Sequence, residues 1–174
     1  LFLPLDTETV KPVPHDNKII KVAHATRSRY YKGTDYIVNV VNSLAKKLPV
    51  EMVLMENVPH AECMNIKSQC DIYVDQLTDK GGWGYGMSSV EAMAMGLAVC
   101  TFLNDKYTEF LGDNGFVNVN QDNLEVVLTK LIVDADYRKA MSEKGREWVV
   151  KTHDVNVVMK QLYQYYKESG ILNN

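Results

Sequence analysis

Strand-like and helix-like segments alternate along most of this chain. Apolar runs at 18–25, 50–56 and 71–77 are typical of buried strands. Segments with apolar residues at helical spacing, at 34–48 and 60–70, lie between them. Strands that alternate with helices form parallel sheets through right-handed crossovers. The pattern therefore predicts an α/β, Rossmann-like fold, a parallel sheet with helices on both faces.

The alternation continues to the end of the chain. A fourth and a fifth strand are predicted at 97–103 and 115–119. Asn123 stands where its side chain would cap a helix that starts there. The helices predicted in this half are 88–95, 123–138, 138–153 and 154–170.

The first 17 residues are polar, rich in proline and without sustained periodicity. We interpret 1–17 as a linker or peripheral segment and 18–174 as one domain, because 174 residues suit a single core. The chain begins with Leu1 rather than methionine, which we interpret as a sign of a fragment or a processed product.

Composition and charge exclude several classes of protein. Hydrophobic residues make up 46% and charged residues 24%, as in ordinary globular domains. The net charge of −3 argues against nucleic acid as a partner. We find no apolar run of membrane-spanning length and no secretory signal, so we expect a cytoplasmic location. The three cysteines lack the paired spacings of metal or redox sites and are expected to be buried, and we expect no metal site.

A glycine-rich loop, KGGWGYG at 80–86, directly precedes the predicted helix at 88–95. Gly82, Gly84 and Gly86 let successive backbone N–H groups converge on an anion, to which the helix also directs its free N–H groups. The spacing fits neither a dinucleotide fingerprint nor a P-loop. The glycines alone are therefore as consistent with a plain loop as with a phosphate site.

Basic residues follow the first predicted strand. Arg27, Arg29 and Lys32 would lie at the carboxyl edge of the sheet, where ligands of such folds bind. They could neutralise a diphosphate, or they could form a solvated basic turn. We expect Lys32 to be exposed when no ligand is bound.

Several other polar residues have two interpretations. Ser88 and Glu91 have the spacing of a capping box, but the Glu91 carboxylate could instead bind sugar hydroxyls. His24 is expected to be a structural histidine. Asp75 could contact a polar ligand or the neighbouring loop, and Trp83 and Tyr85 could stack on a sugar or base or pack the loop. No nucleophile–base pair is visible, so the catalytic residues are unknown.

From about residue 18 onward the chain resembles the C-terminal, donor-binding domain of GT-B glycosyltransferases. The resemblance is to the retaining, group 1 type, and the aromatic-rich loop is similar to that of a bacterial subgroup. It implies one half of a GT-B fold that binds a nucleotide diphosphate sugar. The stretches that carry it are HATRSRYYKGTDYI, ENVPHAECMNIKSQCDIYVDQL, GWGYGMSSVEAMAMGLAVC and LIVDADYRKAMSEKGREWVVKTH.

The resemblance implies a role for individual residues. Arg27 and Lys32 would bind the donor diphosphate, with Arg29 as a rival for the place of the arginine. Glu91 matches the second glutamate of the E-x7-E motif, which binds the donor ribose, whereas Trp83 replaces the first glutamate. This replacement affects which donor sugar the chain would bind and how that sugar would be transferred. The loop that meets the phosphate or the transferred sugar would be Gly84, Gly86, Met87 and Ser88, and further base or sugar contacts would be Val58, Asp75, Trp83 and Tyr85.

The resemblance also implies the whole reaction. A sugar would move from a nucleotide diphosphate sugar to an acceptor such as a glycan or a lipid-linked glycan, without a metal or another cofactor. The acceptor site would belong to an N-terminal domain, which could also associate with a membrane surface, and this fragment alone would be inactive. The alternatives are a non-catalytic nucleotide-binding module and a nucleotide-sugar epimerase of similar fold.

Overall fold

A computed structural model describes residues 1–80 and 84–171 of the chain. It contains a five-stranded sheet in the order β2-β1-β3-β4-β5, in which every neighbouring pair is parallel. The five predicted strands and the parallel sheet are therefore confirmed. The strands are β1 (Ile20–Thr26), β2 (Val50–Glu56), β3 (Ile72–Val74), β4 (Ala98–Thr101) and β5 (Phe116–Asn118).

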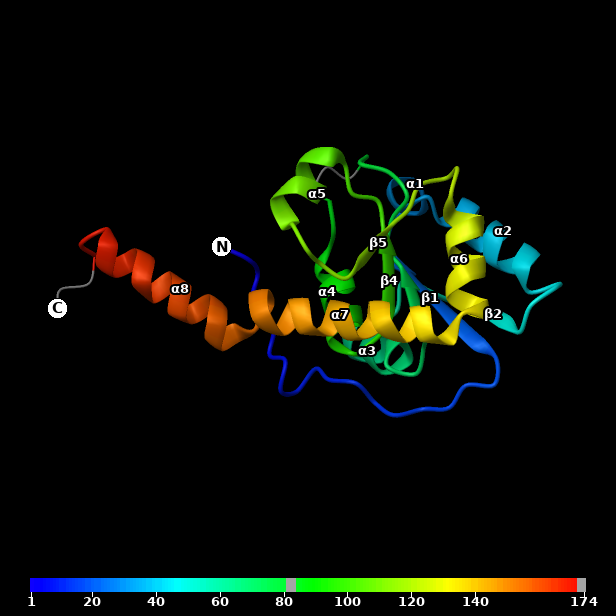
Figure 1. Ribbon diagram of the computed structural model, residues 1–174, viewed down its shortest axis with the longest axis horizontal. Helices are drawn as coiled ribbons and strands as arrows, with labels where there is room; N and C mark the ends of the chain where they lie inside the picture. The colour runs from blue at the N-terminus through cyan, green and yellow to red at the C-terminus, as the bar shows by residue number, and fades with distance from the viewer. Residues whose placement is uncertain (81–83, 172–174) are drawn as a thin grey trace.

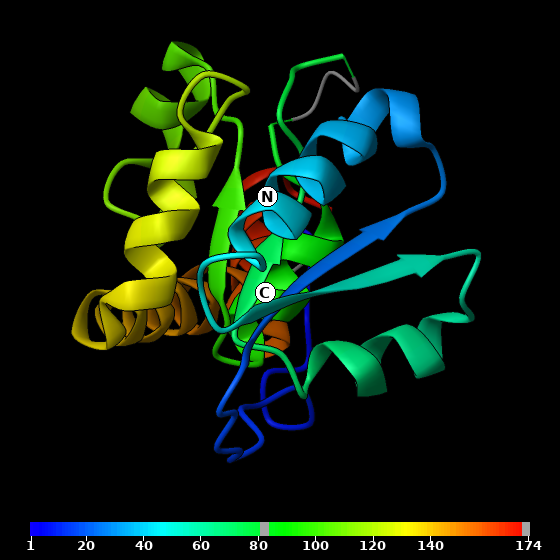
Figure 2. The same cartoon turned by 90° about the vertical axis from the view of Figure 1, so that its right-hand side faces the viewer.

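Helices cover both faces of this sheet (Figures 1 and 2). Side chains alternate between the faces of a strand, so Ile72 and Val74 pack into one half of the core and Tyr73 into the other. The first half contains α2 and α6, and the second contains α4 and α7. The helices are α1 (Arg29–Lys32), α2 (Thr34–Leu44), α3 (His60–Lys67), α4 (Met87–Ala94), α5 (Asp105–Leu111), α6 (Leu124–Val133), α7 (Ala135–His153) and α8 (Val155–Glu168).

The structure corrects the boundary between the helices predicted at 123–138 and 138–153. The helix predicted at 123–138 ends at Val133, because the Asp134 side chain accepts a hydrogen bond from the Tyr137 N–H at 2.9 Å and caps α7. The predicted side-chain cap by Asn123 is wrong. Its Oδ1 instead accepts a hydrogen bond from the backbone N–H of Asn120 at 2.8 Å. The short helices α1 and α5 were not predicted.

The segment 1–17 runs along the outside of the domain and is fixed at several points (Figure 1). The Leu5 N–H donates to the His153 carbonyl at 2.7 Å, and the Leu5 carbonyl accepts from the Val155 N–H at 2.9 Å. The Arg146 guanidinium donates to the carbonyls of Thr7 and Val10, each at 2.8 Å. These contacts hold the segment against the middle of α7 and at the junction of α7 and α8.

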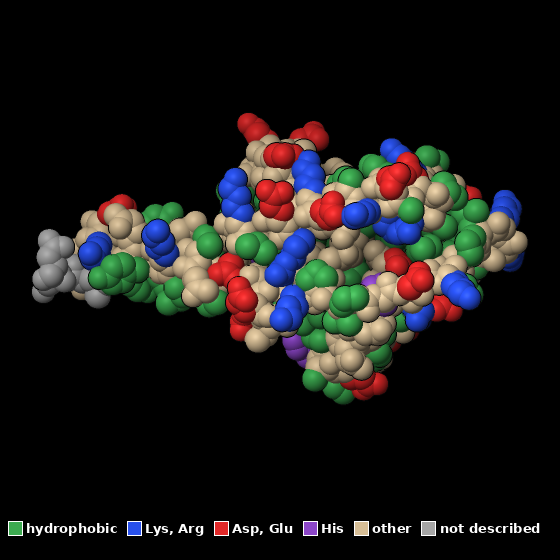
Figure 3. Space-filling model, turned by 60° about the horizontal axis from the view of Figure 1, so that its bottom comes forward, with side chains coloured by type: hydrophobic (Ala, Val, Ile, Leu, Met, Phe, Trp, Pro, Cys, Tyr) green, Lys and Arg blue, Asp and Glu red, His purple; other side chains and the backbone are tan. Residues whose placement is uncertain are grey.

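Helix α8 projects away from the sheet domain (Figure 1). Hydrophobic side chains gather on it (Figure 3), and Met159, Tyr163 and Tyr165 are each more than half exposed. Among the described helices, none has the length and hydrophobicity needed to cross a membrane.

The start of β5 and the middle of α7 approach each other very closely at two glycines. A Cβ atom added to Gly115 would lie 2.2 Å from both Cα and N of Gly145. Only a residue without a side chain fits at position 115, so this contact fixes how α7 lies across the sheet.

Candidate functional site

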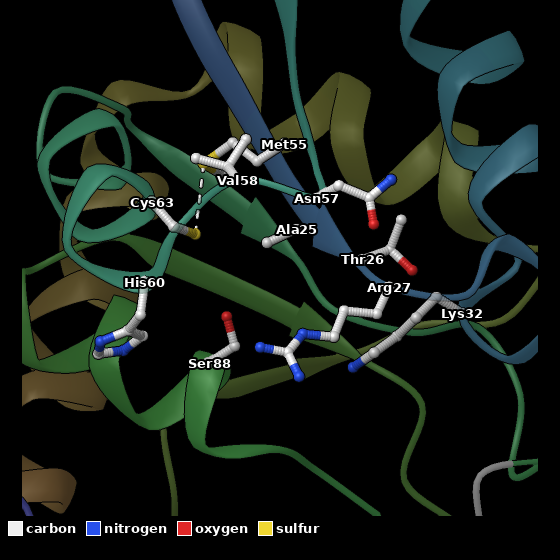
Figure 4. Close-up of a pocket in the computed structure, with 10 residues that line it drawn as sticks. All are labelled: Ala25, Thr26, Arg27, Lys32, Met55, Asn57, Val58, His60, Cys63 and Ser88. Carbon is white, nitrogen blue, oxygen red and sulfur yellow. Dashed lines mark hydrogen bonds between the residues drawn. The ribbon is translucent and has the colours of Figure 1, made fainter.

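A cavity of about 340 Å³ opens at the carboxyl ends of β1 and β2. The chain passes from β1 to β2 on one side and then to β3 on the other side of β1, so strand order reverses here. Ligands of open α/β sheets bind at this kind of reversal. Figure 4 shows the side chains that line the cavity, which are Ala25, Thr26, Arg27, Lys32, Met55, Asn57, Val58, His60, Cys63 and Ser88.

The arginine that faces the cavity is Arg27. Its guanidinium and the Lys32 ammonium point into the same space as the Ser88 hydroxyl (Figure 4). Arg27 forms no ion pair with any residue in the described ranges. Its charge is therefore available to an anion in the cavity.

Arg29 does not line this cavity. Its Nε donates to Glu56 Oε1 at 2.8 Å, and its Nη1 lies 2.5 Å from Asp35 Oδ1. Hydrogen bonds to Glu56 and Asp35 raise the pKa of the Arg29 guanidinium above its ordinary value. Two arginines were expected at this turn. Arg29 binds the last residue of β2 and the first turn of α2, whereas Arg27 is free to bind a ligand.

Asp75 is completely buried behind Lys32. One carboxylate oxygen pairs with the Lys32 ammonium. The other accepts from the Gly86 N–H at 3.1 Å and from the Ser89 hydroxyl at 2.7 Å. Burial raises the pKa of the Asp75 carboxyl, but the Lys32 charge and these hydrogen bonds outweigh it and lower the pKa below its usual value. Asp75 thus ties together the turn after β1 and the start of α4.

The expectation of an exposed Lys32 is wrong. Three quarters of its side chain is covered, and its charge is balanced by Asp75. The reason is that the turn after β1 folds over the end of β3, where the Lys32 carbonyl accepts from the Leu77 N–H at 3.3 Å.

Gly84 and Tyr85 of the glycine loop pack into the protein. Gly84 has φ of +67°, and an added Cβ would lie 2.9 Å from the Tyr107 ring. The Tyr85 ring packs against Phe116 at 5.0 Å between centroids, and its hydroxyl lies 3.1 Å from His153 Nε2. Tyr85 and Met87 line a separate cavity of about 420 Å³. Trp83 lies outside the described residues, so its expected ligand contact stays a prediction.

Gly86 directly precedes the first turn of α4, and its N–H donates a hydrogen bond to Asp75. The next two N–H groups, of Met87 and Ser88, donate to no backbone or side-chain atom of the described ranges. Because Ser88 lines the cavity, these two groups and the positive end of the helix dipole are the backbone features available to an anion.

The capping box expected from Ser88 and Glu91 does not form. Helix α4 begins at Met87, so Ser88 is its second residue and not its cap. The two oxygens of Glu91 bind other side chains. Oε2 accepts from Lys67 Nζ at 2.7 Å, and Oε1 lies 2.8 Å from His60 Nε2.

His24, Cys70 and Cys100 have structural environments, as expected, whereas Cys63 was expected to be buried but is partly exposed and lines the cavity. Burial lowers the pKa of His24, whose Nδ1 bonds the Val74 carbonyl at 2.7 Å and whose Nε2 bonds the Thr34 hydroxyl at 2.8 Å. Burial raises the pKa of both Cys70 and Cys100 to about 12, so these thiols are protonated and unreactive. No cluster of His, Cys, Asp and Glu that could hold a metal ion occurs in 1–80 or 84–171.

Solved structures with this fold include the C-terminal domain of a glycosyl transferase group 1 family protein, LpcC, from Francisella tularensis. It is 18% identical with a TM-score of 0.66, and the match covers 87% of this chain and 99% of that one. Sucrose-phosphate synthase from Thermosynechococcus elongatus is 14% identical with a TM-score of 0.71, over 97% of this chain and 52% of that one. This chain has the fold of a GT-B C-terminal domain.

The GT-B C-terminal fold also occurs in HepE from Anabaena, solved in complex with UDP and glucose. That structure is 13% identical with a TM-score of 0.68, and the match covers 95% of this chain and 55% of HepE. The chain thus spans about half the length of these larger relatives in structure. No protein family model and no curated protein matches the sequence.

Proposed function

We propose that the chain is the donor-binding half of a glycosyltransferase. It holds a nucleotide diphosphate sugar whose sugar is passed to a glycan or a lipid-linked glycan. The observation that carries the proposal is the convergence of Arg27, Ser88 and the open end of α4 on one cavity at the strand reversal. Support comes from HepE, a protein of the same fold that was solved with UDP and with UDP-glucose.

The diphosphate lies between the turn after β1 and the start of α4. Arg27 provides the free positive charge, and the Met87 and Ser88 N–H groups provide oriented donors. Lys32 contributes a further cation, although Asp75 balances its charge. When the sugar leaves, these groups stabilise the charge that develops on the diphosphate. They supply this stabilisation without a metal ion, and metal independence is part of the proposal.

The nucleoside lies toward β2 and α3. Met55 and Val58 form an apolar wall for the base, and Glu91, which contacts the cavity-lining His60, accepts hydrogen bonds from the ribose. The acceptor site is assigned to an N-terminal domain outside this chain, any membrane association belongs to that domain, and the catalytic groups are not assigned. The cytoplasmic location expected from the sequence stays a prediction.

Calorimetric titration with UDP, ADP and GDP tests donor binding. We expect one of them to bind the chain in roughly the micromolar to millimolar range, with no change when a chelator is added. Arg27→Ala is expected to weaken that binding by about ten- to a hundredfold, because a charge-assisted phosphate contact is lost. The melting temperature should stay within about 2 °C of wild type, since Arg27 is exposed.

Arg29→Ala is the matched control, because Arg29 is two residues away and bears the same charge but does not line the cavity. Its affinity for the nucleotide should equal that of the wild type. The proposal is wrong if none of the three nucleotides binds, if binding requires a divalent ion, or if the two arginine variants lose affinity equally.

A further inference from the structure

Lys67, the last residue of α3, is completely buried beneath the candidate site. Its ammonium donates to the Ser88 carbonyl at 3.2 Å, the Ser88 hydroxyl at 2.9 Å and Glu91 Oε2 at 2.7 Å. It also lies 5.1 Å from the centroid of the Tyr73 ring. All three N–H donors of this lysine are therefore directed at the start of α4.

A buried lysine is costly for folding unless its charge is paired. An apolar side chain of similar volume commonly stabilises a core position as well as or better than an ion pair does. Glu91, the partner of Lys67, is itself only 9% exposed. The pair therefore points to a requirement other than stability, namely a carboxylate held in a fixed position beside His60, which lines the cavity.

The pair divides the two oxygens of the Glu91 carboxylate between the core and the cavity. Oε2 points inward to Lys67. Oε1 points outward to His60, whose side chain is 71% exposed and lines the cavity. An exposed imidazole is easily displaced, so a hydroxyl group of a ligand can take its place at Oε1.

Lys67 also orients Ser88. The Ser88 oxygen accepts hydrogen bonds from both Lys67 Nζ at 2.9 Å and the Tyr73 hydroxyl at 2.8 Å. A hydroxyl oxygen has two lone pairs, and both are then occupied. The hydroxyl hydrogen is left to donate to an acceptor elsewhere, and Ser88 lines the cavity beside Arg27 (Figure 4).

We propose that Lys67 is a positioning residue that presents Glu91 to the ribose and Ser88 to the diphosphate of the bound nucleotide. It contacts neither ligand group itself and acts through the two side chains that it holds. This inference rests on the proposed donor site, and it identifies the buried group that makes the site selective for ribose hydroxyls.

The test compares UDP with 2′,3′-dideoxyuridine diphosphate, which lacks the ribose hydroxyls, and uses the corresponding pair for ADP or GDP if that nucleotide binds best. Wild type is expected to bind the ribonucleotide at least tenfold more tightly, as charge-assisted hydrogen bonds to a carboxylate require. In Lys67→Met this ratio should fall to less than threefold. A ratio measured on one sample is insensitive to the fraction of folded protein, so a purely structural role of Lys67 would not change it.

A second variant and a control complete the design. Lys67→Met leaves the Glu91 carboxylate buried without its cation. The double variant Lys67→Met/Glu91→Gln removes both charges and should therefore be more stable than Lys67→Met. It should show the same low ratio of affinities. Lys46→Met, at an exposed lysine, should keep the wild-type ratio.

Each outcome assigns the failure to a different step. If wild type binds no nucleotide, the donor site itself is wrong. If wild type binds but does not discriminate between the two nucleotides, Glu91 is not a ribose ligand and the inference about Lys67 is overturned while nucleotide binding stands. If Lys67→Met discriminates as well as wild type does, Glu91 does not need Lys67, and the inference is again overturned.

Discussion

Replacing Asp75 by alanine is expected to lower the free energy of unfolding by about 2–4 kcal/mol, because buried hydrogen-bond donors lose their acceptor and Lys32 loses its counter-charge. The carboxylate is completely buried, and its loss removes the counter-charge of Lys32 and the acceptor for Gly86 and Ser89. Denaturation by urea, monitored by circular dichroism, measures the change. Without Asp75, the turn after β1 and the start of α4 are no longer joined through one carboxylate.

Two comparisons make this experiment specific. Asp122→Ala, at an exposed aspartate, should change the free energy of unfolding by no more than about 0.5 kcal/mol. In a double-mutant cycle, Lys32→Ala should cost much less stability in the Asp75→Ala background than in wild type. A loss below about 1 kcal/mol in Asp75→Ala would contradict this description of the buried ion pair.

Replacing Gly115 by alanine is expected to cost about 3 kcal/mol or more, at or above the upper end for overpacked cores. The added Cβ would lie 2.2 Å from backbone atoms of Gly145, which cannot move aside by changing a rotamer. The backbone angles of Gly115 are outside the left-handed region, so the whole effect comes from β5 packing against α7. Thermal unfolding should show a fall in melting temperature of about 6–12 °C.

Gly112→Ala is the control for this substitution. Gly112 has φ of +58° and ψ of −135° but no atom within 4 Å of an added Cβ, so its loss of about 1–3 kcal/mol would come from backbone strain alone. If Gly115→Ala is as stable as wild type, α7 does not cross β5 at this contact.

Periodicity predicted most of the fold, because the strands and the long helices each bury a regular pattern of apolar residues. It missed α5, which buries only Leu111 and so carries no apolar stripe. It also joined α6 to the start of α7, because the apolar spacing continues across Asp134. The local hydrogen bond from Tyr137 to Asp134 determines that boundary, and hydrophobicity does not report it.

The sequence predicted the cavity only in part. Arg27 and Lys32 were expected at the edge of the sheet because they follow a strand, and Ser88 was expected there from the family resemblance. All three line one cavity. Lys67 and His60 were missed, since they meet Glu91 only after folding, across 24 and 31 residues of sequence. The capping-box interpretation of Ser88 and Glu91 was wrong because α4 begins at Met87. Local spacing could not reveal that a distant lysine holds the Glu91 carboxylate.

A crystal structure of the chain with bound UDP, grown in the presence of a chelator, tests the donor site most directly. We predict that the diphosphate contacts the Arg27 guanidinium and the N–H groups of Met87 and Ser88, with the ribose on Glu91 and no metal ion bound. A nucleotide found instead in the second cavity, between Tyr85 and Phe110, or a diphosphate that contacts neither Arg27 nor α4, would contradict the proposed function.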